Sequence, residues 1–230
     1  MSMFNRKTIQ IFSGNNRRIE CTRLLLFVFL FTGNLHAQTR EIDSLKRLVL
    51  TPNVKRDTSL FNTYIELSKA TLKRDLEQTK VYTLQAQELA DELNYAQGNG
   101  EVEYAKGKIA LSTSNFVSAR DRFFKALEIF RENKIRKKYA ACYTAIGLTY
   151  QNTGDLDKAM SYFEKSLEYG KKYDPSSNSL TYMNMGTIYA YRSNFDQSLV
   201  YFHKAQELLQ TQGKVDGLST CYNNIGCIFD

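Results

Sequence analysis

Residues 143–167 decide the fold, and they read YTAIGLTYQNTGDLDKAMSYFEKSL. The apolar residues between Tyr143 and Tyr150 fall on one face of a helix. Gly154 and Asp155 then interrupt the pattern, because glycine suits the left-handed end of a helix and aspartate caps the start of the next. A second apolar stripe of helical spacing follows. The segment therefore predicts two helices packed as a hairpin.

This hairpin recurs with a period of 39–40 residues, in four columns that repeat in phase. The columns are Gly107, Gly147, Gly186 and Gly226; Ala119, Ala159 and Ser198; Phe123, Phe163 and Phe202; and Ala126, Ser166 and Ala205. A glycine inside a helix costs about 1 kcal/mol relative to alanine, so the glycine column indicates close approach of the paired helix. One such hairpin cannot bury its apolar face alone, and stacked copies form an all-α solenoid.

These columns resemble the tetratricopeptide repeat, whose pattern is an aromatic residue, a Leu-Gly pair, a tyrosine, an alanine, a phenylalanine and a second alanine. One copy supplies Tyr143, Ile146, Gly147, Tyr150, Ala159, Phe163 and Ser166. The resemblance implies a right-handed α-solenoid with copies at about 60–99, 100–139, 140–178 and 179–218 and an incomplete copy at 219–230. The period exceeds the family's usual 34 residues and the closing proline is missing. HEAT-like repeats share the longer period but lack this order of residues.

The first copy departs most from the pattern, because Leu67, Thr79, Thr83 and Ala86 fill its columns. Polar connectors between copies are expected at 94–100, 132–138, 171–179 and 212–217.

Residues 1–37 read as a secretory signal peptide. A basic segment ends at Arg23, an apolar run fills 24–31, and a small residue, Ala37, stands where cleavage is expected. Eight apolar residues are too few for a membrane span, which needs about 20; an uncleaved anchor is the alternative. We therefore expect export to the periplasm, an N-terminal capping segment at 38–58 with one short helix, and no transmembrane helix in the mature chain.

The order of these parts resembles the exported N-terminal repeat regions of Bacteroidetes-type sensor kinases and transcriptional regulators. The features shared with that group are the Ala-Gln pair at 37–38, the Ile-Asp-Ser-Leu segment at 42–45 and the degenerate first copy. The resemblance implies the extracytoplasmic sensor portion of a signal-transduction protein. The alternative is a free-standing periplasmic or outer-membrane assembly or adaptor factor.

The charge balance does not favour a nucleic-acid partner. The formal net charge is +7, but the leader holds five basic residues and one acidic residue, which leaves 26 basic and 23 acidic residues in the remainder. A basic cluster at 131–138 reads as a solvated connector between helices, with a site for an anionic partner as the alternative.

The motifs of enzymes and cofactor sites are missing. The glycines at 98 and 100 lack the rest of a phosphate-binding loop, and the two histidines, His36 and His203, form no metal-binding or catalytic pattern. We therefore expect no catalytic activity and no cofactor. Cys142, Cys221 and Cys227 are expected to be free and mostly buried thiols, with an intermolecular disulfide as the alternative.

The family resemblance implies that the first helix of each copy lines a concave groove for a protein or peptide ligand. Side chains off the packed stripe are the candidates for this groove, and they are Tyr104, Lys108, Thr144, Gln151, Asn184, Thr187, Asn223 and Asn224. Asn184 and Asn224 share one column, where the family often uses an asparagine to hold a peptide backbone, because an amide both donates and accepts hydrogen bonds.

The last helix of the pattern, from Leu218 onward, carries an apolar stripe with no second helix after it. Such a stripe needs a partner, so self-association through this helix is expected.

Overall fold

The computed structural model describes residues 40–229, and the expected signal peptide lies outside them. The chain divides into two compact units, residues 1–51 and 52–230. The described part of the first unit is a helix over 40–49. The second unit contains α2 (Thr58–Thr71), α3 (Leu76–Glu92), α4 (Ala96–Ser112), α5 (Phe116–Glu132), η1 (Arg136–Lys138), α6 (Tyr139–Asn152), α7 (Leu156–Tyr173), η2 (Pro175–Ser177), α8 (Asn178–Tyr191), α9 (Phe195–Thr211) and α10 (Val215–Phe229).

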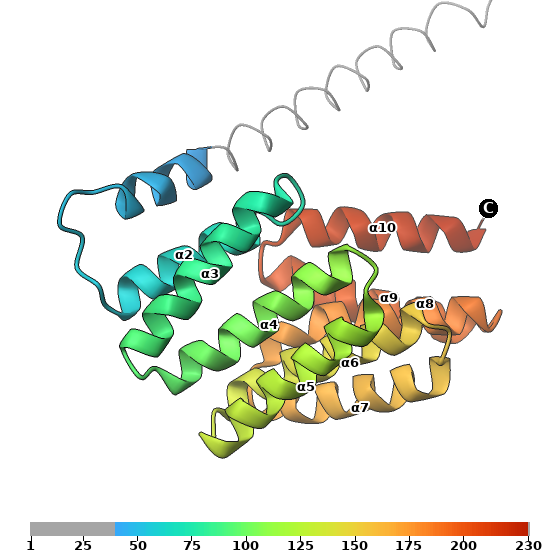
Figure 1. The fold of residues 1–230 in the computed structure, drawn as a ribbon. Helices are drawn as coiled ribbons and strands as arrows, with labels where there is room; N and C mark the ends of the chain where they lie inside the picture. The colour runs from blue at the N-terminus through green and yellow to red at the C-terminus, as the bar shows by residue number, and fades with distance from the viewer. Residues whose placement is uncertain (1–39, 230) are drawn as a thin grey trace, which may run out of the picture. The chain divides into compact units, whose positions relative to one another are not determined.

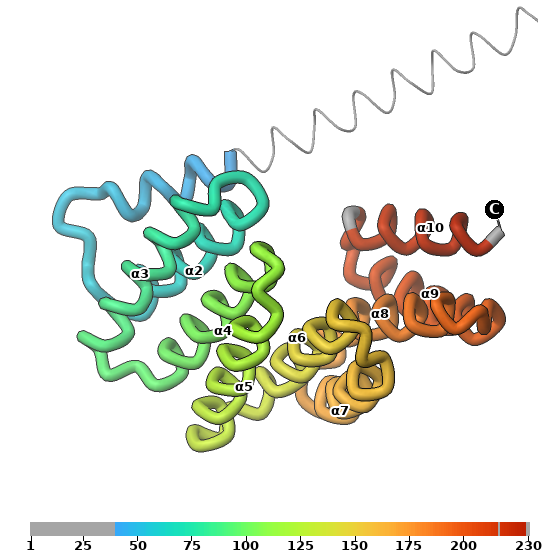
Figure 2. Tube along the Cα trace, turned by 45° about the vertical axis from the view of Figure 1, so that its right-hand side comes forward, coloured from blue at the N-terminus to red at the C-terminus, as the bar shows by residue number. Residues whose placement is uncertain are grey.

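The second unit is an α-solenoid, as the sequence predicts. The helices pack as hairpins α2–α3, α4–α5, α6–α7 and α8–α9, and each hairpin also packs on the next. Figure 1 shows the ribbon, and the turned view of Figure 2 separates the successive hairpins from α2 to α10. We call α2, α4, α6 and α8 the first helices and α3, α5, α7 and α9 the second helices.

The turns within the last three hairpins share one geometry. Gly154 has the expected positive φ of 83°, and Asp155 caps α7 by accepting a hydrogen bond from the backbone N–H of Lys158. Ser114 and Ser193 occupy the position of Gly154 in the neighbouring hairpins, with φ of 57° and 56°. This left-handed residue closes the end of the helix by backbone hydrogen bonds, so the serines carry a strain that glycine avoids.

The glycine column lets the two helices of a hairpin approach closely. A Cβ added at Gly147 would lie 2.6 Å from Cε1 of Phe163 and 3.1 Å from the carbonyl oxygen of Ala159. The equivalent distances to the phenylalanine ring are 2.5 Å at Gly107 and 2.8 Å at Gly186. The three phenylalanines of this column, Phe123, Phe163 and Phe202, are almost fully buried. The ring of each second helix therefore fills the space that the glycine of the first helix leaves.

In the first hairpin the larger of the two packed side chains lies on the first helix and the smaller on the second. Leu67 stands in the glycine column and Thr83 in the phenylalanine column, and both are buried. Hydroxyl groups join the two helices here: Ser68 Oγ lies 2.8 Å from Thr83 Oγ1, and Thr71 Oγ1 lies 2.9 Å from Thr79 Oγ1. A large residue on the first helix thus replaces the large residue on the second.

The helices extend further into the expected connectors than the sequence suggests. The connector expected at 94–100 is mostly helical, because α4 begins at Ala96. Gly98 and Gly100 belong to the packing of that helix, where an added Cβ would lie 2.5 Å from the rings of Tyr95 and Phe130, respectively. The first helices begin at 58, 96, 139 and 178, and α10 begins at 215.

The three thiols in the described part of the chain are free, as expected. Cys142 and Cys221 are buried, and Cys227 is exposed. Burial raises the pKa of Cys142 to about 12, so this thiol behaves as a small apolar side chain.

Candidate functional site

A pocket of about 220 Å³ opens on the first helices, between α2, α4 and α6. Its lining includes Lys69 from α2, Tyr104 and Lys108 from α4, and Lys138 from the end of η1. Ile65, Phe130 and two alanines supply apolar walls. We call this cavity the lysine pocket. It brings together residues from three successive copies, because the solenoid places one turn of each first helix beside the next.

Lys108 is the cation of the pocket that has no acidic partner within the described residues. Lys69 pairs with Glu66 at 2.7 Å, and Lys138 pairs with Glu101 at 3.0 Å. Lys108 is half-buried, and no carboxylate of residues 40–229 lies within salt-bridge distance of it. Burial lowers the pKa of Lys108, and the nearby charges of Lys69 and Lys73 lower it further. The nearby charge of Glu66 acts in the opposite direction, but Glu66 already pairs with Lys69. A half-buried ammonium group without a salt-bridge partner is costly, and an acidic ligand would relieve that cost.

Tyr104 forms the aromatic wall beside this lysine. Its ring packs on Phe123 with centroids 5.3 Å apart, so the glycine–phenylalanine core of the hairpin fixes its orientation. Burial raises the pKa of the Tyr104 hydroxyl, which stays protonated and able to donate a hydrogen bond. Apolar walls and one cation without a salt-bridge partner together suit a ligand with an acidic group and an apolar body.

Of the eight residues expected in a groove, only Tyr104 and Lys108 line this pocket. Gln151, Asn184 and Thr187 are half-buried on α6 and α8, and Asn223 and Asn224 lie on α10. Gln151 Oε1 and Asn184 Nδ2 are buried without a hydrogen-bond partner in the described part of the chain. Thr187 donates a hydrogen bond to the carbonyl of Met183 on its own helix.

Thr144 differs from the expectation, because its hydroxyl faces the interior. Thr144 Oγ1 lies 2.7 Å from Ser166 Oγ and 2.7 Å from Thr181 Oγ1, and it donates to the carbonyl of Ala140. The three hydroxyls join α6, α7 and α8 at the seam between two copies. A buried and fully hydrogen-bonded hydroxyl is a structural group, so Thr144 is not offered to a ligand.

Sequence reasoning missed Lys69 and Lys138 as pocket residues. Lys138 belongs to the basic cluster that reads as a solvated connector, yet it pairs with Glu101 and lines the cavity. Lys69 lies 39 positions before Lys108, in the preceding copy, and Lys138 lies 30 positions after it, in the connector before α6. Only the stacking of copies brings the three lysines together.

Two further properties concern residues 40–229 alone. Within this part of the chain no helix combines the length and apolar character needed to cross a membrane. The same residues contain no cluster of histidine, cysteine, aspartate or glutamate side chains able to hold a metal ion.

Residues 140–171, which form α6 and most of α7, match the tetratricopeptide repeat family model. A comparison with curated proteins finds no match. Solved structures share the fold at low identity. The Rap protein complexed with Competence and Sporulation Factor superposes with a TM-score of 0.69 at 13% identity, over 86% of this chain and 62% of that protein. BtubC from P. vanneervenii superposes with a TM-score of 0.62 at 18% identity, over 84% and 81% of the two chains.

A Signal Transduction ATPase with Numerous Domains protein from Pyrococcus horikoshii, which has a tetratricopeptide repeat sensor, is also similar. Its TM-score is 0.61 at 19% identity, over 86% of this chain and 31% of that protein. The chain thus spans less than two thirds of both this protein and the Rap protein. At these identities the likeness concerns the fold alone.

Proposed function

We propose that this chain is a repeat scaffold that binds a protein or peptide, and that its ligand seat is the lysine pocket. The unpaired ammonium group of Lys108 beside the ring of Tyr104 is the observation that carries the proposal. The ligand is a segment with an acidic side chain or terminal carboxylate next to an apolar residue. The carboxylate pairs with Lys108, and the apolar residue packs between Tyr104 and Ile65.

We further propose that this binding serves as the input of a signal-transduction protein, and that the repeats act outside the cytoplasm. Two similar folds support the first part: one belongs to a signal-transduction ATPase with a tetratricopeptide repeat sensor, and the other is a Rap protein complexed with Competence and Sporulation Factor. The basic, apolar and small-residue order of residues 1–37 supports export. Amino-terminal sequencing of protein from the periplasm tests export; an intact leader there would contradict it.

The binding test uses peptides selected from a random display library on the purified protein. The selected sequences should be rich in aspartate and glutamate, and one of them is then synthesised for titration calorimetry. Lys108→Met keeps the length of the side chain but removes its charge, and it should weaken binding at least about tenfold, as expected for a charge pair at a partly buried site. Lys108→Arg should retain part of the affinity.

Lys80→Met is the matched control, because Lys80 is an exposed lysine of α3 that pairs with Glu77 on its own helix. This variant should bind like the wild type. A selection that yields no acidic peptide, or equal affinity of the acidic peptide for the Lys108→Met and Lys80→Met variants, would contradict the proposed ligand seat.

A further inference from the structure

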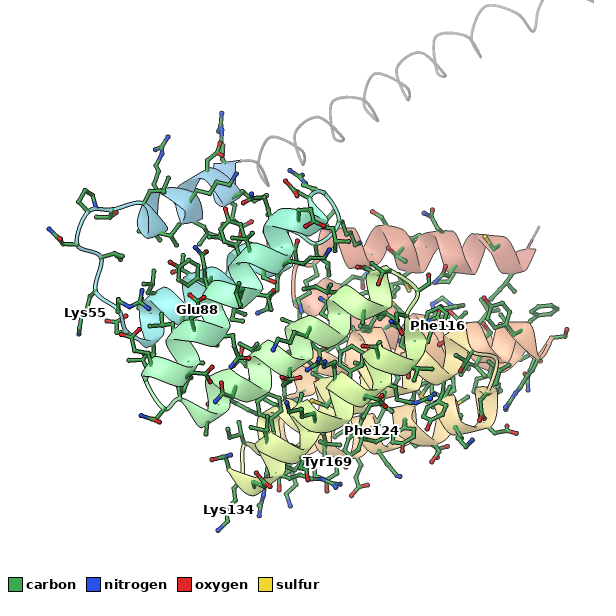
Figure 3. All side chains as sticks on the ribbon, viewed as in Figure 1. Lys55, Glu88, Phe116, Phe124, Lys134 and Tyr169 are labelled. Atoms are coloured by element: carbon green, nitrogen blue, oxygen red, sulfur yellow. The ribbon has the colours of Figure 1, made fainter. Side chains whose placement is uncertain are left out.

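A second and larger cavity lies on the opposite set of helices. It is an open groove of about 1050 Å³ between the second helices α5 and α7, and Tyr143 of α6 also lines it. Four aromatic rings line it: Phe124 of α5, Tyr143 of α6, and Tyr162 and Tyr169 of α7. Figure 3 labels Phe124 and Tyr169, which come from the two helices that border the groove. We call it the tyrosine groove.

The rings form a connected set rather than separate contacts. Phe124 meets Tyr162 edge to face across the groove, with centroids 6.0 Å apart. The ring of Tyr143 lies 6.3 Å from that of Tyr162 and 5.6 Å from that of Tyr169. Phe124 is 37% exposed although it is a large apolar residue. The groove therefore offers a rigid aromatic surface that reaches solvent.

The fold does not require aromatic residues at these positions. The preceding copy places Glu103 and Arg122 in the columns of Tyr143 and Tyr162, and these two side chains form an ion pair at 2.8 Å. An ion pair in one copy and a tyrosine pair in the next thus occupy the same two columns.

The following copy keeps a tyrosine pair, Tyr182 and Tyr201, with centroids 6.2 Å apart. One copy further along the chain, however, the columns of Phe124 and Tyr169 hold Glu164 and Leu208, so these two rings are the ones particular to the tyrosine groove.

The cations around the rings have interaction partners within the described residues, whereas the carboxylates do not. Each cation of the lining already has a partner within the protein: Lys125 pairs with Glu103 at 3.3 Å, Arg131 donates to the Tyr143 hydroxyl at 2.6 Å, and Lys165 lies 4.9 Å above the Tyr162 ring. The carboxylates of the lining have no ion pair or hydrogen bond within the described residues; they are Asp121, Glu128, Glu132 and Glu168. The lining thus holds four carboxylates and three cations, which leaves it negative by one charge, and its unpaired carboxylates stand on both bordering helices.

The size of the groove fits a helix. A helix about 10 Å across that rises 1.5 Å per residue fills roughly 120 Å³ per residue, so the groove volume corresponds to about nine residues, or two to three turns. Two helices with apolar residues between them and charged residues along their edges form the usual seat for an amphipathic helix.

We propose that the tyrosine groove docks a basic amphipathic helix of a partner protein. The apolar face of that helix, with anchors at helical spacing, packs on Phe124, Tyr162 and Tyr169. Its lysine and arginine residues flank this face and pair with Glu128 on α5 and Glu168 on α7. The attraction is local, because the chain as a whole carries a formal net charge of +7 and repels a basic peptide.

The test uses the purified protein and a fluorescein-labelled peptide of about 16 residues, long enough to be partly helical alone. The peptide carries leucine and phenylalanine at i, i+3, i+4 and i+7, with lysine at the flanking positions. An acidic twin has glutamate in place of each lysine, and a second twin has a central proline. Fluorescence anisotropy at about 50 mM and about 300 mM NaCl should show binding of the basic helix only, weaker at the higher salt.

The repeat supplies a matched control for the rims. Glu88, Glu128, Glu168 and Glu207 occupy one column, and all four are exposed. The double variant Glu128→Lys/Glu168→Lys reverses both rims and should weaken binding at least about tenfold. The double variant Glu88→Lys/Glu207→Lys makes the same change in net charge at the same register, on α3 and α9, and should bind within about twofold of the wild type.

A second pair tests the aromatic surface. Phe124→Ala should weaken binding at least about threefold, whereas Leu84→Ala, in the same column on α3 and 59% exposed, should not. Circular dichroism establishes that all four variants are folded. Equal binding by the rim and control variants, preference for the acidic helix, or binding of the proline-containing peptide as tight as that of the basic helix would each overturn the proposal.

Discussion

The ring of Phe163 occupies the space that a side chain at position 147 would need, because an added Cβ on Gly147 would lie 2.6 Å from Cε1 of that ring. Glycine is unfavourable inside a helix, but here it allows close contact between the two helices of the hairpin. The last member of the same column, Gly226 on α10, has no atom of the described residues within 4 Å of an added Cβ. Two glycines of one column therefore differ in the space around them: a side chain at position 147 would clash, and one at position 226 would not.

These two glycines give the first prediction. Gly147→Ala should lower the free energy of unfolding by about 1–3 kcal/mol, because the ring and the helix backbone must move apart. Gly226→Ala should leave it unchanged or raise it by up to about 1 kcal/mol, because alanine favours a helix and meets nothing. Urea unfolding followed by far-ultraviolet circular dichroism measures both. A similar loss in the two variants would show that the shared column does not report helix contact.

Much of the fold was predictable, because the columns of small and aromatic residues indicate which helix faces are in contact. The positions of the helix ends were harder to predict. Glycine predicted the left-handed turn at Gly154, but Ser114 and Ser193 adopt the same conformation without the residue type that signals it. Gly98 and Gly100 look like connector residues in the sequence, yet each packs under an aromatic ring inside α4.

The site was predictable only in part. Tyr104 and Lys108 follow from their offset on one helix, whereas Lys69 enters the lysine pocket from the preceding copy and Lys138 from the connector before α6. Spacing within one copy also cannot distinguish the seam between copies from the groove, which is why Thr144 is buried against Ser166 and Thr181.

The reversed sizes at Leu67 and Thr83 give a second prediction. Thr83→Phe alone should destabilise by about 1–3 kcal/mol, because no space is free beside Leu67. Leu67→Gly alone should cost about 2–5 kcal/mol through a cavity and a helical glycine. The double variant recreates the pairing of Gly147 with Phe163 and should cost at least about 1 kcal/mol less than the sum. Additive costs, within about 0.5 kcal/mol in urea unfolding, would rule out the compensation.

The hydroxyl cluster at the seam gives a third prediction. Thr144→Val removes the hydrogen bonds to Ser166 and Thr181 and should lower the free energy of unfolding by about 1–2 kcal/mol. Thr187→Val is the control, because its hydroxyl bonds only to its own helix and should cost less than about 0.5 kcal/mol. Peptide affinity should be the same in both variants. A loss of affinity in Thr144→Val without a loss of stability would indicate that Thr144 contacts the ligand, as the sequence predicts.

Glu103 gives a final prediction, on pH. Its side chain is only 6% exposed, and it accepts from Arg122 at 2.8 Å while Lys125 and Lys106 lie at 3.3 and 3.4 Å. Burial by itself raises the pKa of this carboxyl, but Arg122, Lys106 and Lys125 outweigh burial and hold the pKa below its ordinary value of 4.5. The folded state thus releases the proton more readily than the unfolded state does.

A lowered folded-state pKa stabilises the protein above the ordinary value, and this contribution is lost as the pH falls through the folded-state value. Glu103→Gln, which resembles the protonated acid, should therefore be less stable than the wild type by about 1–3 kcal/mol at pH 7, because three cations lose their carboxylate. The difference should shrink as the pH falls below about 4.5. Urea unfolding between about pH 7 and pH 3 measures it, with Glu88→Gln as an exposed control on α3. A difference that stays constant over this range would mean that Glu103 contributes by packing and not by its charge.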